Sequence, residues 1–112
     1  MPTTRQNKIA RLIQKDLSEI FVLKSKDLFQ GKLISVTSVR VTPDLAEAKI
    51  YVSIFPSAKA PEVVAEIEAV NKLIRHELAQ KVKSQLRIIP DLKFFIDDSL
   101  DFAEKIDKLL AG

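Results

Sequence analysis

Basic side chains between positions 72 and 87 are the residues of this chain best suited to binding chemistry. On a helix that turns by about 100° per residue, a group of them falls within about a third of the circumference: Lys72, Arg75, Lys83 and Arg87. Lys81 points to the other side of the same helix. Such a stripe can hold a row of phosphates, whereas the plainer alternative is a solvated helix face. The residues alone leave these two alternatives equally open.

A second basic group lies near the N-terminus. Residues 1–15 contain basic side chains and no acid, and Lys8, Arg11 and Lys15 fall in one narrow arc beside an apolar stripe. Glu19 sits at the edge of that arc, and a group of acidic residues lies instead between positions 97 and 112. We therefore expect Lys8, Arg11 and Lys15 to face an anion while the neighbouring side of the helix packs.

Few other residues are suited to catalysis or metal binding. The chain has no cysteine, two glycines and one histidine, His76, which excludes disulfides, thiolate chemistry and a Gly-rich phosphate loop. Asp97, Asp98 and Asp101 are possible Mg²⁺ ligands, but the dipole of a helix capped by Ser99 explains these acids adequately. We expect no enzymatic activity, cofactor, metal or small-molecule substrate, and we expect His76 to be a bystander in the basic helix.

Length and composition favour one domain. With 112 residues and 46% hydrophobic content, the chain suits a single core that spans residues 1–112. No apolar run approaches the ~20 residues of a membrane span, and the first residues lack the apolar core of a signal peptide. The absence of cysteine fits a reducing compartment. We expect a cytoplasmic monomer that does not contact a membrane.

Hydrophobic periodicity predicts the helices that position the basic residues. Residues 4–23 predict an amphipathic helix, followed by a polar loop over residues 24–32. A long helical segment runs from Pro61 to about Leu86, and Ala69-Val70-Asn71 interrupts it with a kink. The exposed charges are acidic before this interruption and mostly basic after it. A short C-terminal helix is predicted after Ser99.

Alternating patterns predict the strands. Residues 34–41 form the first strand, and a slip in their alternation indicates a bulge. Pro43 suits the second position of a tight turn, where Asp44 can bond its own backbone. The return strand covers residues 48–55 and the last strand covers about residues 92–97. The side chains of the return strand that face inward are Ile50, Val52 and Ile54. We expect the hairpin to serve as scaffold, with Arg40 and Lys49 as its only candidate ligand contacts.

The aromatic residues do not predict a base-reading surface. Phe21, Phe94 and Phe102 fall on apolar faces and are expected in the core, whereas Tyr51 and Phe95 have the outward parity of their strands. We therefore expect recognition of nucleic-acid backbone and shape more than of base sequence.

Two signatures resemble a known family. Val41-Thr42-Pro43-Asp44-Leu45 precedes Ala48-Lys49-Ile50-Tyr51-Val52-Ser53, and the basic helix ends before Pro90-Asp91-Leu92, with Asp98-Ser99 downstream. The opening helix, with Arg5 and Ile9, fits the same pattern. In this order and at these spacings, the chain resembles bacterial ribosome-binding factor A over nearly its whole length.

The resemblance implies a fold. This family is similar to type II KH domains, but a kink, usually Ala-x-Gly, replaces the Gly-x-x-Gly loop that clamps nucleotides. The matching residues here are Ala69-Val70-Asn71, and asparagine follows glycine in preference for left-handed or irregular backbone. We expect an α+β, KH type II-like fold in the order α-β-β-α-α-β, with a three-stranded sheet, a kinked helix pair and a short C-terminal helix.

The resemblance also implies a function. It points to a non-catalytic assembly factor that binds the immature small (30S) ribosomal subunit, assists late maturation of 16S rRNA and has a role in cold adaptation. The residues expected to bind RNA are Lys8, Arg11, Lys15, Asn71, Lys72, Arg75, Lys83 and Arg87. The alternatives are a basic protein-interaction domain and a general KH-like RNA-binding module that is not dedicated to the ribosome.

Overall fold

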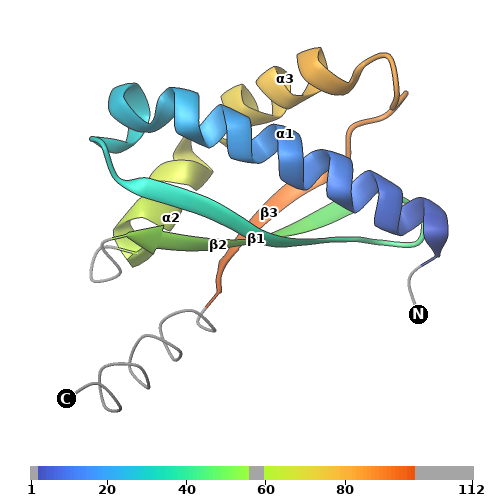
Figure 1. Cartoon of the computed structure of the whole chain (residues 1–112), viewed down its shortest axis with the longest axis horizontal. Coiled ribbons are helices and arrows are strands. Elements are labelled where there is room, and N and C mark those ends of the chain that lie inside the picture. Colours follow the sequence, from blue (N-terminus) through green and yellow to red (C-terminus); the bar gives the residue numbers. More distant parts are fainter. Residues whose placement is uncertain (1–2, 56–59, 98–112) are drawn as a thin grey trace.

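The fold is a three-stranded sheet packed against helices (Figure 1). The computed structural model describes residues 3–55 and 60–97. Its elements are helix α1 (Thr4–Phe29), strands β1 (Leu33–Val41) and β2 (Glu47–Phe55), helices α2 (Ala60–Ala69) and α3 (Asn71–Val82), and strand β3 (Asp91–Ile96). The element order and the sheet confirm the expected α+β, KH type II-like arrangement. The predicted C-terminal helix lies outside the described residues.

The sheet is mixed, with β2 at its centre. Strands β1 and β2 are antiparallel, and β3 pairs with β2 in parallel. Ile50, Val52 and Ile54 of β2 are buried, as the alternation predicts, while Lys49 stays exposed. Helix α1 packs on β1, α2 packs on β2 and β3, and α3 packs on α1. In Figure 1, α1 accordingly runs between α3 and β1. None of the helices in the described part of the chain is both long and apolar enough to cross a bilayer.

The slip in the first strand is a β-bulge. The register of β1 against β2 shifts between Val36 and Ser38, which confirms the predicted irregularity. The side-chain amide of Gln14 donates to the carbonyl oxygens of Val36 at 3.1 Å and Thr37 at 3.3 Å. Helix α1 thus satisfies backbone acceptors that the bulge frees from the ladder.

The hairpin turn has the predicted geometry. The Leu45 N–H donates to the Thr42 carbonyl oxygen at 2.8 Å, which puts Pro43 at the second position. The Asp44 carboxylate accepts from the Thr42 hydroxyl at 2.7 Å and from the Ala46 N–H at 3.1 Å. These hydrogen bonds hold the pKa of the Asp44 carboxyl below its ordinary value.

Helix α1 extends to Phe29, so the predicted end at Leu23 is wrong, and the predicted loop over residues 24–32 shrinks to residues 30–32. The Phe29 ring is fully buried, with its centroid 5.9 Å from that of Phe21. The helix ends where Gln30 and Gly31 take left-handed conformations, with φ of 53° and 78°. Between Leu23 and Phe29 the exposed side chains are mostly polar, a composition that is typical of a loop. The burial of Phe29, which the local sequence does not reveal, is what extends the helix.

The long helical segment breaks at Val70, which confirms the predicted kink. Val70 has φ −109° and ψ 18°, outside helical values, and it separates α2 from α3. Helix α3 ends at Val82 rather than near Leu86, so the predicted C-terminal end is wrong. The Val82 carbonyl oxygen accepts from the N–H groups of Gln85 and Leu86. The chain turns here because it must return to enter β3 parallel to β2.

An ion pair between α3 and α1 supplies a pH-dependent test of this packing. The Lys81 Nζ lies 2.9 Å from Glu19 Oε2, and the pair lowers the pKa of Glu19 and raises that of Lys81. A lowered folded-state pKa contributes stability above the unfolded pKa of the carboxyl and loses it as pH falls through the folded pKa. We expect Lys81→Met to lower the melting temperature at pH 7, with the difference from the parent shrinking in acid. Thermal melts across pH check this, with exposed Lys26→Met as the matched control.

Candidate nucleic-acid interface

The basic residues converge on the connection between α3 and β3, residues 83–90, called here the α3–β3 connection. One hollow beside it is lined by Lys72, Arg75, His76 and Ala79 of α3 and by Arg87, Ile88 and Ile89 of the connection. The structure thus brings Lys72, Arg75 and Arg87 together, as the sequence predicts. Arg87, however, reaches the hollow from irregular backbone and not from the helix. Lys83 is exposed at the C-cap of α3 and does not line this hollow.

Arg75 positions the α3–β3 connection. Its Nη2 donates to the Ile89 carbonyl oxygen at 2.6 Å, and its Nε donates to the Pro90 carbonyl oxygen at 3.3 Å. The Asp91 carboxylate lies 3.8 Å from the same guanidinium. The planar fork of arginine suits this arrangement, because several donors act at once. Arg75 therefore holds the backbone that carries Arg87, and its side chain remains half-exposed at the hollow.

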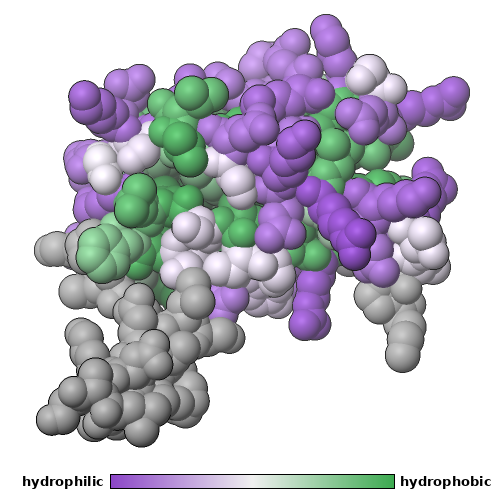
Figure 2. Space-filling model, in the orientation of Figure 1, coloured by the Kyte–Doolittle hydropathy of each residue, from purple (hydrophilic) through white to green (hydrophobic). Residues whose placement is uncertain are grey.

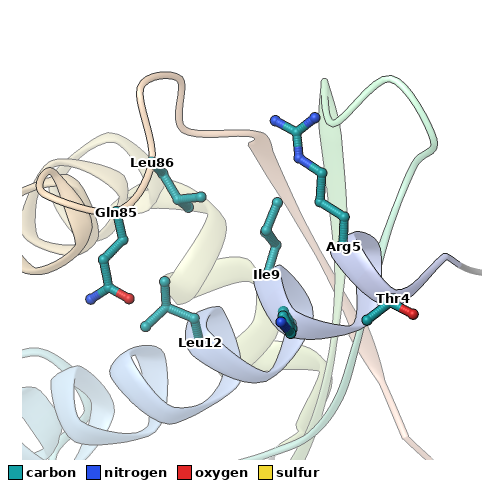
Figure 3. Close-up of a pocket in the computed structure, with 7 residues that line it drawn as sticks. Thr4, Arg5, Ile9, Leu12, Gln85 and Leu86 are labelled. Atoms are coloured by element: carbon teal, nitrogen blue, oxygen red, sulfur yellow. The ribbon is translucent and has the colours of Figure 1, made fainter.

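The N-terminal end of α1 adds two more cations to the same region. Arg5 and Lys8 line a hollow with Gln85 and Leu86 of the connection, and Figure 3 shows Leu86 pointing toward α1 above Ile9 and Leu12. Arg5 and Arg87 also line a third hollow, which reaches the β1–β2 turn. The N-terminal turn of α1 thus meets the basic residues of the connection through Arg5 and Arg87.

The structure separates the basic residues predicted to act together on α1, which are Lys8, Arg11 and Lys15. Lys8 lines the hollow against the connection, whereas Arg11 and Lys15 are exposed and line neither hollow that holds Arg5. Arg5 is absent from the predicted site, although it belongs to the same acid-free run. Arg5 lies one helical turn before Lys8, and this spacing indicates that the two side chains share one side of α1. The first turn of α1 is anchored to β1, because the Gln6 side-chain amide donates to the Val41 carbonyl oxygen at 2.8 Å. This anchor places Arg5 near Arg87.

Asn71 braces the kink and does not form it. Asn71 is the first residue of α3, and the non-glycine residues with positive φ in the described part of the chain are Gln30 and Leu45. Within the predicted kink Ala69-Val70-Asn71, Val70 carries the irregular conformation. The Asn71 amide donates to the Leu92 carbonyl oxygen at 3.0 Å and to Glu68 Oε2 at 3.1 Å. It ties the start of α3 to β3 and to α2.

Removing this brace is expected to destabilise the protein. Asn71→Ala removes both hydrogen bonds and should lower the free energy of unfolding by about 0.5–1.5 kcal/mol. Asn71→Gly should cost more, because glycine in a helix adds conformational entropy to the unfolded chain. Urea denaturation measures both, and Gln80→Ala on the exposed side of α3 is the control. Equal stability of Asn71→Gly and the parent would show that the amide contributes nothing.

The surface agrees with an electrostatic interface. Figure 2 shows hydrophilic side chains over much of α3 and α1, with hydrophobic surface both near the α3–β3 connection and at the opposite end. That end carries Val22, Leu23, Leu33 and Phe55, all strongly exposed. Among residues 3–55 and 60–97, no cluster of three His, Cys, Asp or Glu residues is placed to hold a metal ion. The arrangement can therefore offer cationic hydrogen-bond donors to an anionic polymer.

Comparison with solved structures shows which proteins share this fold. The crystal structure of ribosome-binding factor A from Thermus thermophilus matches with a TM-score of 0.65 at 23% identity, over 81% of this chain and 94% of that one. A homology model of the Thermus thermophilus protein, fitted into a cryo-EM map of its complex with the 30S subunit, matches with a TM-score of 0.62 at 23% identity, over 80% of this chain and 91% of that one.

Comparison of sequences shows the family. The family model described as ribosome-binding factor A matches residues 5–110. Ribosome-binding factor A of Flavobacterium psychrophilum is 50% identical over 113 aligned positions, which cover 100% of this chain and 87% of that protein. The protein of the same name from Chlorobaculum tepidum is 42% identical over 108 positions, covering 95% of this chain and 88% of the other. The chain therefore belongs to the ribosome-binding factor A family.

Proposed function

We propose that this chain is a non-catalytic assembly factor that binds the immature small ribosomal subunit through 16S rRNA and assists its late maturation, with a role in cold adaptation. It acts in the cytoplasm as a monomer with a single KH-like domain over residues 1–112. Membership of the family supports this proposal, as does the Thermus thermophilus relative fitted into a map of its 30S complex. The observation that carries it is the convergence of Arg5, Lys8, Lys72 and Arg87 on the α3–β3 connection.

The chemistry of this region favours RNA over an acidic protein. The hollows around the connection are lined by cations from α1, α3 and the connection itself, with Asp44 as the one carboxylate in their linings. Arginine and lysine donors spread over several elements match phosphates that follow a curved backbone. Contacts of this kind read shape and charge and leave base identity unread.

Salt-dependent binding to the subunit tests the proposal. Co-sedimentation with immature and mature small subunits, and with naked 16S rRNA, is measured at several salt concentrations. We expect the immature subunit to bind most tightly, and the logarithm of its binding constant to fall steeply with the logarithm of salt concentration. A flat salt response would overturn the RNA-binding proposal and favour a protein partner. Equal binding to unrelated RNA would instead favour a general RNA-binding module.

A genetic readout tests the role in maturation. A strain that lacks this protein should accumulate precursor 16S rRNA, with the largest excess at low temperature. The intact gene should remove the excess, whereas a gene with the charges of Lys72, Lys83 and Arg87 removed should not. Normal 16S rRNA processing in the deletion strain at every temperature would show that the protein has no part in maturation.

A further inference from the structure

The outer face of the sheet carries a stacked aromatic pair. Tyr51 of β2 and Phe95 of β3 are direct cross-strand partners, and their ring centroids lie 5.5 Å apart with an interplanar angle of 28°. The Arg40 guanidinium of β1 lies over the Tyr51 ring, 6.0 Å from its centroid. Because β2 lies between β1 and β3, Arg40 flanks Tyr51 on one side and Phe95 flanks it on the other. Phe95 lies on the edge strand β3 and is 40% exposed.

A row of cations crosses the sheet beside this pair. Arg40, Lys49 and Lys93 are direct neighbours across all three strands, two residues along β2 and β3 from Tyr51 and Phe95. At about 3.3–3.4 Å per residue, this row lies about 7 Å from the aromatic pair. Like charges directly opposite each other destabilise a sheet. In the described part of the chain, the one ion pair in this row joins Lys93 to Glu47 at 3.4 Å.

The β-bulge turns the Arg40 side chain toward the outer face of the sheet. Before the bulge, Ile34 and Val36 point into the core; after it, Val41 does so, and Arg40 is turned outward. An unbulged strand with the starting parity would turn Arg40 inward and Val41 outward. Bulges often serve to re-aim a side chain. Within the bulge, the single hydrogen of the Thr37 hydroxyl is shared between two acceptors, the Asp97 carboxylate and the Tyr51 carbonyl oxygen, which lies 3.2 Å away. This contact ties β1 to the chain on both sides of the aromatic pair.

We propose that this face is a second RNA contact, in which an unpaired nucleobase stacks on Phe95 and its flanking phosphates bind the row of Arg40, Lys49 and Lys93. An anion in the row relieves the repulsion among like charges, and the base continues the Arg40, Tyr51 and Phe95 stack. Stacking of this kind tolerates every base. The inference rests on the proposed RNA-binding function, but it uses a face of the sheet separate from the α3–β3 connection.

Single-stranded RNA binding by matched phenylalanine variants tests this site. Phe95→Leu keeps an apolar side chain and removes the π face, and Phe55→Leu makes the same change at another exposed position, 64% exposed at the end of β2. With a fluorescently labelled octauridine, fluorescence anisotropy should show that Phe95→Leu weakens binding on the order of 10- to 100-fold. Phe55→Leu should bind like the parent. An RNA duplex of equal length should compete poorly, because its bases are already stacked and paired.

Crosslinking locates the contact independently of affinity. Ultraviolet irradiation of the complex with octauridine, followed by mass spectrometry, should place the crosslinked uridine on Phe95 or Tyr51. If Phe95→Leu fails to fold by circular dichroism, the double variant Arg40→Gln and Lys49→Gln replaces it, because both side chains are exposed. That double variant should also bind octauridine more weakly.

The outcomes separate this site from the proposed function. Unchanged octauridine affinity in folded Phe95→Leu, or crosslinks confined to the α3–β3 connection, would overturn the proposed stacking site. Either result would leave the proposal of salt-dependent subunit binding intact. Crosslinks from Phe95 to a ribosomal protein in the subunit complex would overturn the stacking site as well. The variant lacking Lys72, Lys83 and Arg87 should lose subunit binding. If octauridine affinity in that variant still depends on Phe95, the two RNA contacts are separate.

Discussion

Replacing Lys72, Lys83 and Arg87 together with alanine should weaken binding to the small subunit about 100-fold at about 0.1 M salt. The three side chains are exposed, and within the described part of the chain none of them has an ion-pair partner. Each lost phosphate contact should lower the slope of log binding constant against log salt by about 0.7 to 1. Three such contacts correspond to a slope change of about 2 to 3. Arg75 is left in place because it holds the α3–β3 connection.

A charge-matched variant controls for the net charge. Lys24, Lys26 and Lys32 lie toward the opposite end of α1 and in the loop that follows it. Either triple replacement takes the formal net charge from +3 to 0, since three positive charges are removed. The control should retain subunit affinity and most of the salt slope. Equal losses in both variants would mean that the protein senses only bulk charge and has no localised interface.

Phe21→Ala should be the most destabilising single change, with a cost of about 3–5 kcal/mol. The Phe21 ring is fully buried. It contacts Phe29 in an inclined arrangement and Phe94 edge-on, at centroid distances of 5.9 and 6.0 Å. It therefore joins the middle of α1, the last turn of α1 and strand β3. A domain of this size has a total stability of about 5–15 kcal/mol, so this one change removes a large part of it.

The neighbouring residue supplies the control for this prediction. Val22 is 72% exposed, so Val22→Ala should change the free energy of unfolding by no more than about 0.5 kcal/mol. Urea denaturation monitored by far-ultraviolet circular dichroism measures both variants. If Phe21→Ala cost no more than Val22→Ala, the aromatic cluster would not be the link between α1 and β3.

Local periodicity predicted most of the fold. The inward residues of β2, the bulge in β1 and the strand that begins near Leu92 depend on patterns that repeat within a few residues, and the Pro43 turn and the break at Val70 depend on the preferences of local residues. The same patterns placed Lys72 and Arg75 on one side of α3. Such patterns suffice because the burial of one face repeats every two residues in a strand and every three or four in a helix.

The patterns were insufficient wherever an element's end depends on a distant partner. Helix α1 continues to Phe29 because that ring packs on Phe21, although the turn before it is polar on its exposed side. Helix α3 stops at Val82, where the chain turns back toward the end of the sheet at which β3 begins. Helix propensity describes only the local cost of a conformation, and tertiary packing overrides it.

Local patterns in the chain are enough to define the order of elements, the inward faces, the excess of cations and the resemblance to the family. Which cations meet depends on tertiary packing: Arg5 with Arg87, and Arg40 with Lys49 and Lys93. Tertiary packing also decided that Arg75 and Asn71 donate to the backbone of residues 89–92. The reason is that periodicity indicates only which side of a helix or strand is buried. The residues that pack against that side come from a distant part of the chain, and the packing of the whole domain determines which they are.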